Sequence, residues 1–69
     1  MVQIMIKVIG RNSYQRDIEG SKTVAEAMQM LGLRQESHIC LRNGVPITSR
    51  DIISPDDDVT FMEIFSGGY

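Results

Sequence analysis

The sequence contains a single cysteine, Cys40, among its 69 residues, and it has no long apolar run. One cysteine cannot form an internal disulfide or supply a thiol-rich zinc site, so a hydrophobic core has to hold the fold. No apolar stretch approaches the ~18 residues that cross a membrane, and the first residues, which include Gln3 and Lys7, lack the order of a secretory signal peptide. We therefore expect a cytoplasmic protein with no membrane partner.

Positive charge is also scarce. Seven Lys and Arg residues stand against nine Asp and Glu residues, which gives a formal net charge of −2, and the basic residues are scattered singly. Nucleic-acid binders carry basic patches or stripes, so we expect no nucleic-acid partner. A chain of this length forms one domain, and we expect it to be a monomer.

Strand patterns lie at both ends of the chain. Residues 2–9 alternate with period two, and residues 13–19 return after the turn residues Gly10-Arg11-Asn12, which predicts a β-hairpin. Residues 59–64 form the predicted last strand. If the first and last strands pair at the centre of the sheet, they run parallel.

Between these strands the period changes to that of a helix over residues 24–31. Thr23 and Glu26 have the spacing of a capping box at its start. Gly32 suits the left-handed position that ends a helix, and Leu33 can close over the last turn. One stripe of the helix carries four apolar residues: Val24, Ala27, Met28 and Leu31.

A second, shorter hairpin is predicted after the helix. Asn43-Gly44 favours a type I′ turn between strands at residues 37–42 and 45–48, and Pro46 places the latter strand at a sheet edge. Residues 51–53 are expected to form a turn that docks apolar groups. In residues 37–42 we assign Ile39 and Leu41 to the inward face, and the outward face then holds His38, Cys40 and Arg42.

This order of elements predicts an α+β domain, with one helix packed across one face of a mixed sheet. The helix stripe is expected to pack against five residues of the sheet: Ile4, Ile6, Ile39, Leu41 and Phe61. The opposite face would stay uncovered, and an apolar patch there would mark a docking site for a partner protein. The candidate docking residues are Met5, Met62, Ile64 and Phe65.

The tail Ser66-Gly67-Gly68-Tyr69 follows the last strand directly. A glycine pair has no side chains and nearly free backbone rotation, so another protein can draw it into a narrow channel and reach its carbonyl carbon. The alternative is a frayed terminus in which glycine does little harm.

Other residues could suggest a metal site or a catalytic pair, but their spacing does not support either. Asp56-Asp57-Asp58 lacks the spacing of a calcium loop and is better explained as a solvated turn. His38 and Cys40 cannot complete a set of four metal ligands, and their spacing does not favour a nucleophile with its base. We expect no metal site and no enzyme activity of the chain's own.

Taken together, these features resemble the ThiS/MoaD sulfur-carrier family, which has the ubiquitin-like β-grasp fold. The resemblance spans the whole chain and rests on the order of elements and on four segments: Thr23-Val24-Ala25-Glu26-Ala27-Met28, Leu31-Gly32-Leu33, Asn43-Gly44 and Ser66-Gly67-Gly68. It implies a β-grasp domain over residues 1–65, with four to five strands and one main helix, followed by a flexible tail at residues 66–69.

The resemblance also implies chemistry that partners carry out. In the family, a ubiquitin-activating-type enzyme uses ATP to join the carboxylate of the last glycine to AMP, and sulfur then displaces AMP to leave a thiocarboxylate. Gly68 would carry the reactive carbonyl, and Gly67 would give access to it. The chain would bind no cofactor, and it would deliver sulfur to an acceptor or, as related modifiers do, join a target protein.

Tyr69 departs from the family pattern, because it follows the second glycine and leaves the Gly68 carbonyl in a peptide bond. We favour removal of Tyr69 by a tail-processing peptidase. The alternative is a non-catalytic β-grasp interaction module with an inert tail. A nucleotide- or RNA-binding β-grasp domain is a weaker alternative, because no phosphate loop or basic patch is present.

Overall fold

The alternation at the start of the sequence forms a strand with one buried face. In the computed structural model, which describes residues 2–11 and 13–64, β1 (Gln3–Ile9) buries every second side chain. β2 (Tyr14–Glu19) returns antiparallel to it, with Gln3 opposite Glu19 and Val8 opposite Tyr14. The predicted hairpin is confirmed.

The helix α1 (Val24–Leu31) begins and ends where its capping residues predict. The Glu26 N–H donates to Thr23 Oγ1 (3.1 Å), and the Thr23 N–H donates to Glu26 Oε1 (3.0 Å), which completes the capping box. This backbone hydrogen bond from Thr23 lowers the pKa of the Glu26 carboxyl. Gly32 has φ 74°, and the Leu33 N–H reaches Met28 O at 2.8 Å, as a Schellman ending requires.

The second half of the chain supplies the rest of the main sheet. A 3₁₀ turn, η1 (Gln35–Ser37), leads into β4 (His38–Arg42), and β5 (Val45–Ile47) follows after Asn43 (φ 54°) and Gly44 (φ 83°). Positive φ at both residues confirms the predicted turn, since a type I′ turn requires it. The last strand is β7 (Val59–Glu63).

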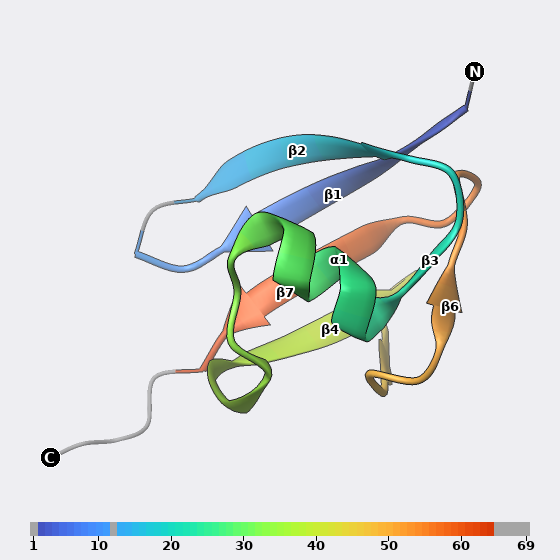
Figure 1. Cartoon of the computed structure of the whole chain (residues 1–69). Coiled ribbons are helices and arrows are strands. Elements are labelled where there is room, and N and C mark those ends of the chain that lie inside the picture. Colours follow the sequence, from blue (N-terminus) through green and yellow to red (C-terminus); the bar gives the residue numbers. More distant parts are fainter. Residues whose placement is uncertain (1, 12, 65–69) are drawn as a thin grey trace, which may run out of the picture.

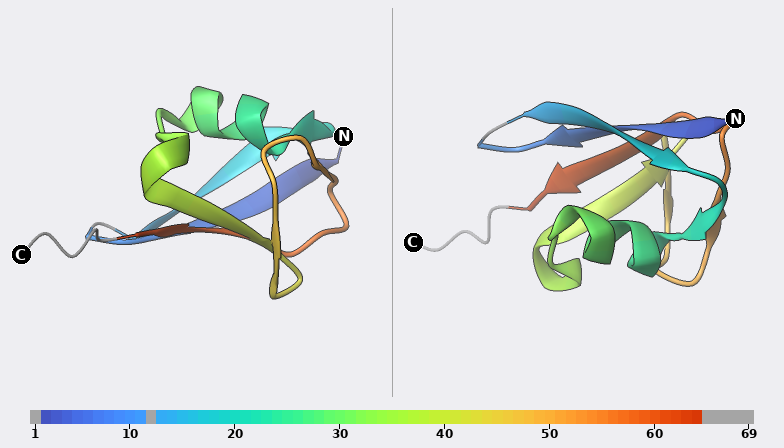
Figure 2. Two further views of the ribbon diagram at one scale, coloured as in Figure 1. Left: turned by 90° about the horizontal axis from the view of Figure 1, so that it is seen from below. Right: turned by 45° about the horizontal axis from the view of Figure 1, so that its top comes forward.

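The five strands form one mixed sheet in the order β2-β1-β7-β4-β5. β1 and β7 pair in parallel, from Ile6 opposite Val59 to Ile9 opposite Met62, whereas the other pairs are antiparallel. The helix α1 lies across one side of this sheet (Figures 1 and 2). This is the ubiquitin-like β-grasp architecture, and β5 with Pro46 lies at an edge as predicted.

A second sheet of two short strands was not predicted. β3 (Lys22–Thr23) pairs antiparallel with β6 (Ile52–Ile53) beside the start of α1. The first helical amides donate into the segment before β6, from Val24 to Asp51 O (2.9 Å) and from Ala25 to Ser49 O (3.1 Å). These bonds satisfy donors that have no partner within a helix, and they tie α1 to residues 49–51.

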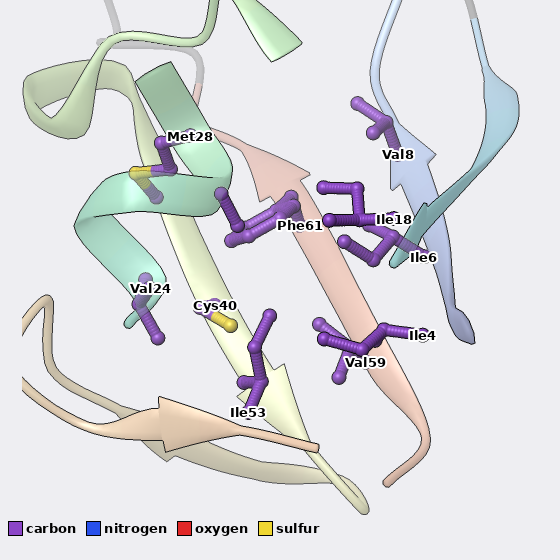
Figure 3. Packing of buried hydrophobic residues seen from close by; sticks show 11 residues of the cluster. Ile4, Ile6, Val8, Ile18, Val24, Met28, Cys40, Ile53, Val59 and Phe61 are labelled. Atoms are coloured by element: carbon purple, nitrogen blue, oxygen red, sulfur yellow. The ribbon is translucent and has the colours of Figure 1, made fainter. Parts of the chain in front are cut away.

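The core lies between α1 and the sheet (Figure 3). Phe61 of β7 is its largest fully buried side chain. Among the described residues it contains eleven buried apolar side chains: Ile4, Ile6, Val8, Ile18, Val24, Ala27, Met28, Cys40, Ile53, Val59 and Phe61. None of the described residues forms a helix long and apolar enough to cross a membrane.

The assignment of faces in β4 was wrong by one residue. Cys40, which lies opposite Phe61, points into the core with 2% of its surface exposed, whereas Ile39 is exposed and Leu41 is half-buried on the other face. Three consecutive apolar residues carry no alternation, so only the register with β7 decides which face each one takes. Leu31 packs against the core as predicted, but it lies at the margin and is half-buried.

The two isoleucines of β6 offer a matched test of this packing. Ile53 is 0% exposed and Ile52 is 56% exposed. Ile53→Val should therefore lower the free energy of unfolding by about 0.5–1.5 kcal/mol, whereas Ile52→Val should change it by less than about 0.5 kcal/mol. Urea denaturation of both variants measures the difference, and equal losses would contradict the assignment of Ile53 to the core.

Candidate functional site

The predicted activation site, Gly67 and Gly68, lies outside the described residues. The same holds for Tyr69 and for the predicted docking residue Phe65. The structure therefore defines the segment from which the tail leaves the domain. That segment is the end of β7 and the residue after it, Ile64 (Figure 1). β7 is the middle strand of the five, so the tail follows directly from the centre of the fold.

Both residues at this point are bonded to neighbouring segments. The Ile64 N–H donates to Ser37 O of η1 at 2.7 Å. Glu63 lies opposite His38 in the register of β4 and β7, and its Oε1 accepts the Arg11 backbone N–H at 3.2 Å. The base of the tail thus has contacts with η1 and with the chain just after β1.

Three apolar side chains lie side by side on the face of the sheet that α1 leaves uncovered. Ile9 of β1 pairs with Met62 of β7, and Met62 pairs with Ile39 of β4. Their exposed fractions are 43%, 36% and 37%. We call Ile9, Met62 and Ile39 the sheet-face row. Its member on β7, Met62, lies two residues before Ile64, so an apolar surface adjoins the base of the tail.

The predicted docking residues are only partly gathered at this row. Met62 is its central member, and Ile64, which is 47% exposed, follows close behind. Met5 is 55% exposed on the same face of β1, but Lys7 stands between it and Ile9.

Ile9 and Ile39 were not among the predicted docking residues. The alternation of residues 2–9 places Ile9 on the outward face, so Ile9 could have been predicted as a docking residue from the sequence. Ile39 could not be predicted as a docking residue, because the sequence analysis assigned it to the inward face of β4.

Cys40 and His38 do not form a reactive pair. Burial raises the pKa of the Cys40 thiol from 9.0 to about 11, which leaves very little thiolate near neutral pH. The His38 Nδ1 lies 3.1 Å from Ser37 Oγ and 3.2 Å from Arg34 O, so it joins the hydrogen bonds of η1. Within residues 2–11 and 13–64, no three His, Cys, Asp or Glu side chains are arranged to hold a metal ion.

The acidic run 56–58 belongs to a hydrogen-bonded turn. Asp57 Oδ2 accepts the Ser54 N–H at 2.9 Å. The Asp58 N–H donates to Asn43 Oδ1 at 2.9 Å, and Asp58 O accepts the Asn43 N–H at 2.8 Å. These bonds join the turn before β7 to the hairpin turn between β4 and β5, so this run shapes a turn.

The raised pKa of Cys40 predicts a pH dependence of stability. The folded chain keeps the thiol proton up to about pH 11, whereas an unfolded chain loses it near pH 9. The stabilisation is therefore fully present below about pH 9 and is lost as pH rises toward about 11.

Between about pH 8 and about pH 10.5, the unmodified chain should lose more free energy of unfolding than Cys40→Ala, which lacks this group. Tyrosine and lysine titrations are common to both chains and cancel in the difference. Urea denaturation at the two pH values measures it. Equal losses would contradict a protonated, buried thiol.

Comparison with known proteins agrees with this architecture. A sequence model of the ThiS family matches residues 8–68, a range that covers most of the chain and includes Gly67 and Gly68. Proteins of this family are small carriers rather than catalysts, and membership supports a role in sulfur transfer together with an adenylating enzyme. A search of curated proteins found no match. From the extent of the family match, we conclude that the chain belongs to the ThiS family.

Proposed function

We propose that the chain is a sulfur carrier whose reactive group is the Gly68 carboxylate, released when a peptidase hydrolyses the Gly68–Tyr69 bond. The observation that carries this proposal is the family match, which runs through the glycine pair and ends at Gly68. Tyr69 lies outside the matched range, as expected of a residue that the activated form does not retain.

The chemistry explains why a partner enzyme and ATP are needed. A carboxylate resists nucleophiles, because its negative charge repels them and it has no good leaving group. Its attack on the α-phosphate of ATP releases pyrophosphate and forms an acyl-adenylate, which removes both obstacles. A hydrosulfide-equivalent donor then adds to the carbonyl carbon and expels AMP, which leaves the thiocarboxylate. The chain itself supplies the carboxylate and a backbone that fits the channel.

Glycine at both positions suits this role. A tail without side chains can enter a narrow channel, and the carbonyl carbon of the last residue is then accessible to both phosphate and sulfur. A tyrosine ring at the end adds bulk where the channel has to close around the reacting atoms. Full activity therefore requires that Tyr69 be removed first.

The proposed docking surface for the adenylating enzyme is the sheet-face row with Met5, Ile64 and Phe65. The row is apolar, exposed and close to the base of the tail, so a partner that covers it would hold the tail near its own channel. Methionine adapts to irregular partner surfaces, which suits Met62 at the centre of the row.

An interaction module with an inert tail is the second candidate function. The exposed apolar row favours it, since such a surface can bind a partner without any tail chemistry. The two candidates differ in whether the tail reacts. Delivery of sulfur and attachment to a target protein differ in the product, which is a thiocarboxylate in the first case and an isopeptide bond in the second.

The tail chemistry is tested with chains of defined ends. A chain that ends at Gly68 should release pyrophosphate from ATP with its cognate adenylating enzyme, whereas the chain with Tyr69 should do so only after a peptidase is added. Gly68→Ala in the shortened chain should slow the step by about 100-fold, because one methyl group at the reacting centre misplaces the carboxylate. If neither chain reacts with any adenylating enzyme of the source organism, the interaction module takes the place of the carrier.

Two methionines provide a matched test of docking. Met62 lies in the sheet-face row, and Met30, which is 60% exposed, lies on α1. Met62→Ala should weaken binding of the adenylating enzyme by at least about fivefold, or about 1 kcal/mol, while Met30→Ala should leave the Kd unchanged. Calorimetric titration measures both. A Met62→Ala variant with unchanged affinity would exclude the row from the interface.

A further inference from the structure

Glu63 occupies an unusual position for a charged residue. Val59 and Phe61 of β7 point into the core, and the alternation of the strand places Glu63 on the same inward face, at the end of the core. Beside it lies a hollow of about 220 Å³ whose walls include Val8, Tyr14 and Leu33. An apolar residue would suit this place better, since a half-buried carboxylate needs hydrogen bonds to offset lost solvation.

Gly10 leaves the space in which Glu63 lies. A Cβ at position 10 would stand 2.9 Å from Glu63 Cβ and would overlap the carboxylate. The φ of Gly10 is not positive, so close packing, and not backbone conformation, requires glycine here. This contact joins the end of β1 to the last residue of β7.

Two hydrogen bonds also attach residues 63 and 64 to neighbouring segments. The Arg11 N–H donates to Glu63 Oε1 at 3.2 Å, and the Ile64 N–H donates to Ser37 O at 2.7 Å. Ser37 is itself held, because its N–H and its hydroxyl both donate to Arg34 O, at 3.1 and 3.3 Å. Residues 63 and 64 are thus fixed from two sides by segments distant in the sequence.

We propose that Gly10 and Glu63 are positioning residues for the tail: they form a clamp that fixes the point from which the tail enters the adenylating enzyme. This inference rests on the proposed function. Gly68 is four residues beyond Ile64, so an extended tail reaches at most about 14 Å from the clamp. Without the contacts of Glu63 with Gly10 and Arg11, the end of β7 is held on one side only, through Ser37 and His38, and the point from which the tail starts is less fixed.

The expected effect is on binding of the tail and not on the chemical step. A less fixed starting point lowers the effective concentration of the carboxylate at the channel. Once the tail is in the channel, the enzyme holds the reacting atoms. The clamp therefore acts on KM and leaves kcat unchanged.

The test uses chains that end at Gly68 in steady-state adenylation assays. Glu63→Ala and Gly10→Ala should each raise the KM for the carrier by at least about threefold at unchanged kcat. Glu63→Gln keeps an oxygen that accepts the Arg11 N–H, so it should retain the KM of the unmodified chain. Glu19→Ala removes an exposed carboxylate from β2 and serves as the matched control.

Amide hydrogen exchange separates positioning from damage to the fold. In Glu63→Ala the amides of Arg11 and Ile64 should exchange faster while that of Phe61 stays protected. A partly unfolded carrier would also raise the apparent KM, because less of the substrate is competent, but it would lose protection at Phe61 as well. If Gly10→Ala fails to fold, the KM of Glu63→Ala alone tests the positioning role. Glu63→Ala only removes side-chain atoms, so it introduces no steric overlap.

The outcomes distinguish this inference from the proposed function. If the unmodified chain ending at Gly68 is not adenylated, the proposed function and the clamp both fail. If it is adenylated and Glu63→Ala keeps its KM, or if Glu63→Gln raises KM as much as Glu63→Ala does, only the positioning role is overturned.

Discussion

The parallel pairing of β1 with β7 is the constraint on which the rest of the structure depends. It brings the first and last strands of the chain together at the centre of the sheet, from Ile6 opposite Val59 to Ile9 opposite Met62. β4 pairs with the other edge of β7, and α1 covers one face of the resulting sheet (Figure 1). Because the pair joins distant residues, loop closure makes it costly to form, and the core with Phe61 has to compensate.

This arrangement also gives the two faces of the sheet separate tasks. The inward face of β7 fills the core, while Met62 on the outward face joins Ile9 and Ile39 in the sheet-face row. A single strand thus stabilises the fold, presents an apolar surface and leads into the tail. The reactive end that we propose therefore follows the middle strand of the sheet in the sequence.

Local signals in the sequence were enough for most elements of the fold. Thr23 with Glu26 and the turn Asn43-Gly44 act through bonds and φ values within a few residues, so both could be predicted. The face of Cys40 is decided by its partner Phe61, and the pair β3–β6 has two residues per strand, too few for a period. The contact of Glu63 with the chain after β1 spans 52 residues, so no local pattern reveals it.

The central claim is that Gly68 becomes a free and then sulfur-bearing carboxyl group, and the intact mass of the protein isolated from its own cells tests it most directly. The account predicts a chain that has lost Tyr69, with a fraction in which one oxygen is replaced by sulfur. The thiocarboxylate fraction should revert to the carboxylate on hydrolysis. A population that retains Tyr69 throughout, with neither sulfur nor an attached target at Gly68, would contradict the account.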